Sequence, residues 1–517
     1  MSSSIRTSGP AGIPPHGHAT EREVLRESVK HDYATEKSGG IVPLDRRRRL
    51  WSMAALWLTM NCGFGEIFIG FEYHQAGFTL LKSVAVSLIG CALYFCYAVP
   101  AAYLGTRTGQ THSLLARSVF GRVGAVVVAT CLLVMGTGFV GFQSSITAQI
   151  FDGLFSWGHL LLVGIAVSIF CILNNVLGFS GVVAWARYVV TPIVVLWIVY
   201  MMVKALATEP SSVLGAHPPV VAGLSVWQGI GAMLGVCVWG DEPDFWRFGK
   251  PRFWWPAVGY AFGLIVGDIL FTLAGWVMAQ LAGAGDFSHS VMYVTTYSLF
   301  GLTWLAFIVA GVSQMAAQDG NYYAAINALQ GMFGEFRRWN RLYSCALAVG
   351  IGCLFTWFVT EGTTAWLDVV TFGSAAVPSA TVIMLVDHYL VPRLLRLSRS
   401  LLTVPTWSTA GVANIPAIVA MIPAIVIGTI GAGSVPGFGG QYWWLPGPFS
   451  WLSAAVVYLA GMAVISRLPN ALTLAGFSDA ARASAVARTP AIEDLATASE
   501  AGSLVAPEAV ASEGLAR

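Results

Sequence analysis

Charged residues are scarce in this chain of 517 residues. Asp, Glu, Lys and Arg make up 10% of it and apolar residues 56%, whereas an ordinary soluble domain has about 25% charged residues. So little charge excludes an ordinary soluble domain and indicates a protein that lies in a lipid bilayer. The formal net charge of only +2 offers no basic surface for nucleic acid, so we expect no nucleic-acid partner.

Disulfide spacing, a cleavable leader and catalytic motifs are also missing. The eight cysteines are scattered through apolar runs, and we interpret them as small core residues. The N-terminus has no short apolar stretch followed by a small-residue cleavage site, so we expect no signal peptide. There is no His/Cys/Asp cluster, nucleophile motif or phosphate-binding loop. We therefore expect no enzyme, no cofactor and no metal.

The chain does contain many apolar runs of about 20 residues, the length that crosses a bilayer as a helix. We predict twelve spans, near 51–72, 80–105, 123–149, 159–180, 183–205, 224–243, 257–283, 299–329, 342–360, 365–388, 411–432 and 447–466. They divide into a ten-helix core (46–400) and two peripheral helices (405–468). Residues 1–45 and 469–517 are polar or low in complexity, and we expect cytoplasmic tails there, the first of them disordered.

Lys and Arg are distributed unevenly over the loops. They precede the first span and follow the second, fourth, sixth, eighth and tenth spans. The loops at 152–158, 206–222, 284–298 and 433–446 contain none. Because cytoplasmic loops carry the positive charge, we predict a protein of the cytoplasmic (plasma) membrane with both termini in the cytoplasm.

Glycines beside acids interrupt two of the spans, at 61–66 in the first and at 229–244 in the sixth. Such breaks are tolerated in a membrane where the backbone lines a cavity or is covered by protein, and acids there indicate function. Because spans one and six are five apart, the repeats 46–205 and 224–390 must be inverted relative to each other. Broken helices at matching positions then indicate a binding site, with Gly229 to Gly235 as the expected hinge. The alternative explanation is that the glycines only allow close helix packing.

Three stretches carry recognisable motifs: Gly105–Gly121, Pro243–Gly249 and Trp366–Leu390. They resemble the nucleobase:cation symporter-1 family, especially its cytosine permease branch, in order and spacing over about residues 45–400. In that family the first stretch is the loop between helices two and three, the second the cytoplasmic end of helix six, and the third helix ten. The resemblance implies an all-α integral membrane protein with the five-plus-five inverted repeat of the leucine transporter and two additional helices.

Span three contains an aromatic ring and an amide on one helical face, Phe139 and Gln143, four residues apart. A flat heterocycle needs a ring to stack on and a group that both donates and accepts hydrogen bonds. The family's segment is similar: its aromatic residue, often Trp where Phe139 stands, stacks on the base, and its Gln hydrogen-bonds the base. The alternatives are core packing for Phe139 and interhelical bonding for Gln143.

The family pattern places a second aromatic residue near Gly235, which cannot stack. Either Trp239, one turn later, replaces it, or the pocket accepts a bulkier ligand than cytosine. In span eight, Gln318 and Asn321 are candidates for binding ring nitrogens and amino groups.

Sodium-coupled relatives resemble span eight but carry a Ser/Thr pair where Ala316 and Ala317 stand. Because a hard cation needs oxygen ligands, we do not expect a sodium site of the family type. A desolvated carboxylate can carry a proton instead. The candidates are Asp319, Glu66, Asp241 and Glu242, with Asp268 and Asp368 as secondary candidates. Structural pairing of Asp319, sodium coupling through a rearranged site and facilitated diffusion are the alternatives.

These observations predict a secondary active transporter that imports a nucleobase-like heterocycle (cytosine, a purine or a related base) by alternating access. Its partners would be a small heterocyclic molecule, H⁺ rather than Na⁺, and the lipid bilayer. The alternatives are a permease for a cationic or amine-bearing heterocycle, such as a thiamine-like vitamin, and a non-transporting membrane sensor on the same fold.

Overall fold

The computed structural model describes residues 41–221, 223–283, 285–290, 300–335, 339–362, 365–399, 406–431, 445–468 and 471–477. Within these ranges the regular structure is helical and contains no strand beyond isolated bridges. The expected tails lie outside the described residues, apart from their inner ends at 41–45 and 471–477.

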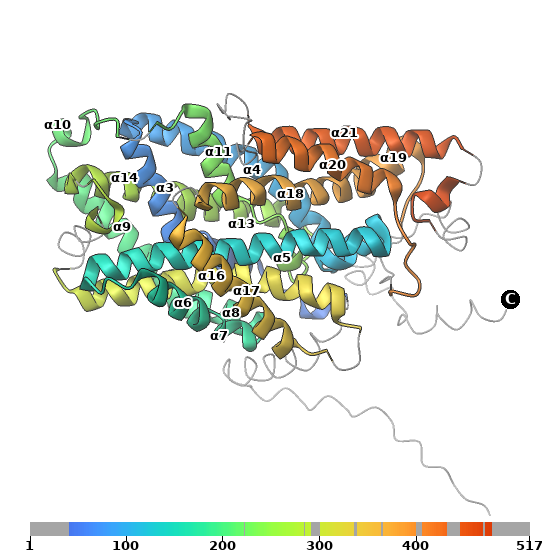
Figure 1. Cartoon of the computed structure of the whole chain (residues 1–517), viewed down its shortest axis with the longest axis horizontal. Coiled ribbons are helices and arrows are strands. Elements are labelled where there is room, and N and C mark those ends of the chain that lie inside the picture. The colour runs from blue at the N-terminus through green and yellow to red at the C-terminus, as the bar shows by residue number, and fades with distance from the viewer. Residues whose placement is uncertain are drawn as a thin grey trace, which may run out of the picture.

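Each expected span corresponds to one helix or to consecutive helices (Figure 1). In chain order these are α2 (Leu50–Met60), α3 (Phe64–Gln75), α4 (Leu80–Thr108), α5 (His112–Phe155), α6 (Leu160–Cys171), α7 (Leu173–Val176), α8 (Phe179–Trp185), η3 (Ala186–Val190), α9 (Thr191–Thr208), α11 (Val226–Cys237), α12 (Glu242–Trp246), α13 (Trp254–Gly263), η4 (Leu264–Ile269), α14 (Leu270–Ala282), α16 (Thr303–Phe333), α17 (Arg341–Glu361), α18 (Ala365–Leu385), η5 (Val386–Leu390), α19 (Val391–Leu395), α20 (Ile415–Gly431) and α21 (Pro446–Ser466). In the described part, seven are long and apolar enough to cross a membrane, or eight if one bent pair counts as a span. The number of twelve therefore stays a prediction.

Both predicted helix breaks are present. The first separates α2 from α3, which are bent by 48°, and Gly63 within it is extended (φ −88°, ψ 169°). The second follows Cys237: Val238 is extended (φ −78°, ψ 120°), and Gly240 has a left-handed φ of 78°, which glycine adopts without strain.

The expectation that Gly229 to Gly235 form the hinge is wrong, because these glycines lie inside α11. A Cβ on Gly235 would lie 2.3 Å from Cγ1 of Val370. Gly235 thus allows α11 to approach α18 closely, which was the alternative explanation for glycines in this span.

The broken helices exchange packing partners in the way that two inverted repeats require. The broken helix of the first repeat packs on the second repeat: α2 contacts α13, and α3 contacts α14. The broken helix of the second repeat packs on the first: α11 and α12 both contact α4. α5 packs along α16, its counterpart in the other repeat. The contact between α3 and α14 is at backbone distance, since a Cβ on Gly275 would lie 1.9 Å from the carbonyl oxygen of Ile67.

α5 is longer than the expected third span because it begins at His112 and continues through a kink at Gly121. Gly121 has φ 74° and ψ −175°, so most of the stretch expected as a loop between spans two and three is helix. At the kink, the freed N–H of Arg122 donates to the carbonyl of Gly411 (2.9 Å). The segment before α20 therefore completes the hydrogen bonding of α5.

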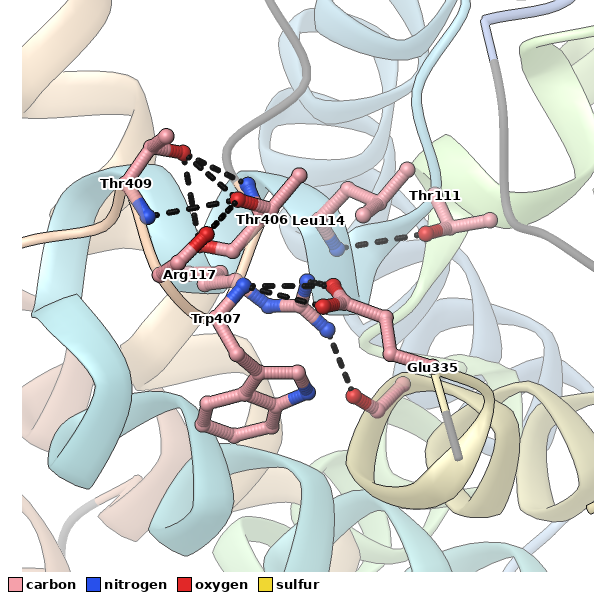
Figure 2. Close-up of polar contacts among 9 residues, drawn as sticks. Thr111, Leu114, Arg117, Glu335, Thr406, Trp407 and Thr409 are labelled. Carbon is pink, nitrogen blue, oxygen red and sulfur yellow. Dashed lines mark hydrogen bonds and ion pairs between the residues drawn. The ribbon is translucent and has the colours of Figure 1, made fainter. Parts of the chain in front are cut away.

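A polar cluster fixes the same segment to the ends of α5 and α16 (Figure 2). Arg117 of α5 forms an ion pair with Glu335 and donates to the carbonyl of Gly331 (2.8 Å). Its guanidinium lies 4.5 Å from the ring centre of Trp407, and the backbone N–H of Trp407 donates to Glu335 (3.1 Å). This cluster joins the chain leading into α20 and α21 to the helices that carry the candidate site.

Candidate substrate site at the helix breaks

A small cavity lies where the two breaks meet α5 and α16. Its lining residues are Met60, Glu66, Met135, Phe139, Gln143, Val236, Val238, Trp239 and Asn321. Half of the ten residues expected at the site line it: Phe139, Gln143, Trp239, Asn321 and Glu66. The cavity measures about 10 Å³, roughly the space that holds one water molecule, so the site is closed in this conformation.

Phe139 and Gln143 line the cavity from α5. Both side chains are almost fully buried, with exposed fractions of 5% and 4%. The Gln143 carbonyl oxygen accepts a hydrogen bond from Gln314 of α16 (2.9 Å). Its amide nitrogen lies at the first break, only 2.8 Å from the position of a Cβ on Gly65. The amide is thus hydrogen-bonded to α16 and lies close to the start of α3.

Trp239 lines the cavity from the second break. Its indole N–H donates to Oδ1 of Asn61, the residue that ends α2 (3.0 Å). Its ring packs on Gly320 of α16, where a Cβ would lie 2.4 Å from the ring. One side chain therefore links both breaks to α16, and the cavity has two aromatic rings, Phe139 and Trp239.

Three of the expected binding and coupling residues lie away from the cavity. Gly235 faces α18, as described above. Gln318 donates to the carbonyl of Val140 and to Oγ of Ser144 on α5 (3.0 Å each). Asp319 accepts from two asparagines of α7, Asn174 (3.0 Å) and Asn175 (3.2 Å).

The two expected acids at the second break, Asp241 and Glu242, are fully buried and do not line the cavity. Glu242 accepts from the hydroxyls of Tyr94 (3.1 Å) and Tyr97 (2.9 Å) and from the N–H of Gly240 (3.1 Å). Asp241, in contrast, has no hydrogen-bond partner on either carboxyl oxygen in the part of the chain that is described.

Glu66 is the acid that lines the cavity. It lies in the first turn of α3, where the helix dipole favours a negative group, and it is 3% exposed. Its Oε2 has no hydrogen-bond partner among the described residues.

The contact between the first break and α16 is the place where the family resemblance locates a sodium site. Ala317 faces this break, with its Cβ 3.1 Å from the position of a Cβ on Gly63, and it provides no side-chain oxygen. The hydroxyl of Ser313 donates to the freed carbonyl of Cys62. This freed carbonyl therefore already accepts a hydrogen bond from the protein.

Sequence reasoning gave Asp268 only secondary rank and assigned no role to Asn61. Asp268 of η4 accepts from Nδ2 of Asn61 (2.8 Å) and from the thiol of Cys237 (3.2 Å). A lone acid in an apolar span was the available signal for Asp268. Its partners lie on other spans, so no local pattern could identify them.

Two broken helices that exchange partners between inverted repeats define the leucine-transporter-type fold of secondary transporters, and solved structures confirm this all-α, five-plus-five fold. The chain is similar to Mhp1, a nucleobase-cation-symport-1 family transporter, in a closed conformation with bromovinylhydantoin bound: 16% identity, TM-score 0.68, over 87% of this chain and 98% of that one. The inward-facing conformation of Mhp1 matches with 16% identity and a TM-score of 0.63, over 86% and 96% of the two chains.

A substrate-bound, outward-open Na⁺-coupled sialic acid symporter also matches, with 11% identity and a TM-score of 0.54, over 85% of this chain and 95% of that one. No protein-family model and no curated protein sequence matches the chain. At these identities the likeness establishes the fold. The higher TM-score against the closed form of Mhp1 agrees with the small size of the cavity.

Proposed function

We propose that this protein is a secondary active transporter of the nucleobase-cation-symport-1 type that imports a nucleobase-like heterocycle by alternating access. The observation that carries the proposal is the cavity at the two breaks, which combines two aromatic rings with two amides. A planar base would stack on Phe139 and Trp239. Gln143 and Asn321 would hydrogen-bond its ring nitrogens and exocyclic groups. The fold shared with a nucleobase-cation-symport-1 family transporter supports this substrate class.

Binding requires the site to open from the closed conformation, because a base is much larger than one water molecule. The Gln143 amide is the group that we expect to exchange partners, releasing Gln314 and taking the base. We further propose the orientation given by the positive loops, with both termini in the cytoplasm of a plasma-membrane protein, and repeats at 46–205 and 224–390.

For coupling we propose H⁺ rather than Na⁺. Ala317, which faces the first break from α16, supplies no side-chain oxygen for a cation. The Cys62 carbonyl at this break already accepts a hydrogen bond from Ser313. Among the expected acids, Glu66 and Asp241 have buried oxygens without a partner in the described part of the chain, whereas neutral donors bind Glu242 and Asp319. An unpaired buried carboxylate is costly, so Glu66 and Asp241 are the acids that we propose to take up protons.

Uptake into proteoliposomes tests the function. We expect purified protein to accumulate radiolabelled cytosine, or a purine found in a thermal-shift screen, when the outside is acidic, and not when a Na⁺ gradient alone is imposed. Accumulation with a Na⁺ gradient at equal pH would refute proton coupling. Base binding that survives both Phe139→Ala and Gln143→Ala would refute the site.

One observation favours a second candidate, a cationic or amine-bearing heterocycle. The unpartnered Glu66 oxygen in the cavity would pair with a positive ligand. The same thermal-shift screen, with thiamine-like cations included, decides between a neutral base and a cationic heterocycle as the substrate. Glu66→Gln should abolish the shift by a cation but leave the shift by a neutral base unchanged.

A further inference from the structure

Asp268 is hydrogen-bonded to both helix breaks at once. It lies in the π-helical segment η4 and is fully buried. One oxygen accepts from Asn61, the C-cap residue of α2 (2.8 Å), and the other from Cys237, the last residue of α11 (3.2 Å). Gly267 brings η4 against the first break, since a Cβ there would lie 2.7 Å from the carbonyl oxygen of Asn61. Short π-helical turns of this kind are frequent at functional sites.

Chemistry fixes the direction of the two hydrogen bonds that join Trp239 to Asn61 and Asn61 to Asp268. The indole nitrogen of Trp239 can only donate, so Asn61 must present its carbonyl oxygen to Trp239 (3.0 Å). The amide nitrogen of Asn61 then faces Asp268 and donates to Oδ2. Oδ2 must therefore be an acceptor for as long as these two hydrogen bonds are formed.

The other oxygen of Asp268 is not constrained in this way. It accepts from the Cys237 thiol, which has a second neighbour, the Cys91 sulfur at 3.9 Å. If Oδ1 carried a proton, the thiol could turn toward Cys91. Only the protonation of Oδ2 is thus transmitted to Asn61 and Trp239.

The titratable groups around Asp268 that the structure describes are acids and thiols. The titratable groups that interact with it are Glu66 from α3, Cys62 from the first break, Cys91 from α4 and Cys237 from α11. In the part of the chain that is described, neither Asp268 nor Glu66 forms an ion pair with Lys, Arg or His. Two interacting buried carboxyls without a cation cannot both be charged at low cost, so the pair is built to hold a proton. The Glu66 oxygen without a partner, in the cavity wall, is the independent sign of a ligand at this place.

We propose that Asp268, which shares a proton with Glu66, couples protonation to the substrate cavity through Asn61 and Trp239. This inference rests on the proposed proton-coupled transport. A proton from water forms an O–H bond at Oδ2, and the hydrogen bond from Asn61 to Oδ2 is lost. The Asn61 amide then turns its oxygen toward Asp268, and the indole N–H of Trp239 loses its acceptor. Trp239 is released from the first break and becomes free to stack on a base.

The sign of the coupling follows from these steps. Protonation frees Trp239, so the affinity for the base rises as the pH falls, as symport requires. We expect about a tenfold change in the affinity for cytosine between mildly alkaline and mildly acidic buffer, within the usual range for two coupled sites.

Asp268→Asn is the decisive variant, because Asn at this position still accepts from Asn61 but cannot take a proton. Cytosine affinity should then stay within about twofold of the alkaline wild-type value at every pH. Counterflow exchange of cytosine should persist, and accumulation driven by a pH gradient should be lost. Asp319→Asn is the matched control, a buried acid bound by two amides, and it should behave like the wild type. A wild-type pH dependence in Asp268→Asn, or its loss in Asp319→Asn alone, would overturn the proposal.

Two further measurements keep the test decisive. Trp239→Phe keeps the ring but removes the N–H, and it should also abolish the pH dependence of binding; a retained dependence contradicts the proposal. If cytosine does not bind to the wild type at any pH, the proposed substrate fails, not the proton site. Infrared difference spectra of the ligand-free full chain between the two buffers then decide. Loss of the protonated carboxyl band in Asp268→Asn supports the proposal, and its persistence refutes it.

Discussion

Replacing Phe139 by leucine tests whether the ring in the cavity wall stacks on the substrate. The ring is 95% buried, since its exposed fraction is 5%, and it lines the cavity. Leucine keeps most of the apolar bulk but removes the aromatic face. Stacking of a base on an aromatic side chain contributes about 1–3 kcal/mol, which corresponds to about a 5- to 150-fold change in affinity. Because Trp239 would still provide one ring, we expect the lower part of this range, about tenfold.

Isothermal titration of the purified protein with cytosine, or with the base found in the screen, measures the effect. Phe120→Leu is the matched control, because Phe120 is a buried phenylalanine of the same helix that does not line the cavity. It should leave the affinity within about twofold, while the two variants lower the melting temperature similarly. Unchanged affinity in Phe139→Leu, or equal losses in both variants, would refute the stacking role.

Three other substitutions test neighbouring features. Gln143→Leu removes the amide and should weaken base binding by about 1–2 kcal/mol, measured by titration; unchanged affinity would contradict its role. Gly320→Ala places a Cβ 2.4 Å from the Trp239 ring and should lower cytosine uptake strongly. Gly311→Ala on the same helix is the control, because its Cβ meets no atom within 4 Å, and it should leave uptake unchanged. Equal uptake by the two variants would argue against the position of Trp239. Gly121→Ala forces a side chain into φ 74° and ψ −175°, a region that costs about 1–3 kcal/mol, so a thermal melt should show clear destabilisation, and an unchanged melt would contradict the kink.

The fold was predictable because its signals are local. Apolar runs of bilayer length gave the spans, and the glycine–acid runs gave both breaks. The exact place of the second break was not predictable, because Gly235 and Gly240 look alike in the sequence. Only the packing of α11 on α18 separates a glycine that allows contact from one that adopts a left-handed conformation.

The site was only partly predictable, for a related reason. Phe139 and Gln143 could be identified because their spacing places both on one face of a helix. The sequence ranked Asp319 above Asp268 as a proton carrier, and the local pattern gave no reason to reverse that order. Their roles depend on partners from distant spans: two amides of α7 for Asp319, and both breaks for Asp268.

The size of the cavity also has a consequence for the membrane as an electrical insulator. A continuous file of water across the roughly 30 Å hydrocarbon core would need about ten molecules in line. The space between the two breaks, about 10 Å³, has room for about one. Among the described residues, the site in this conformation therefore offers no such file of water, so it is not a route by which protons would cross the bilayer.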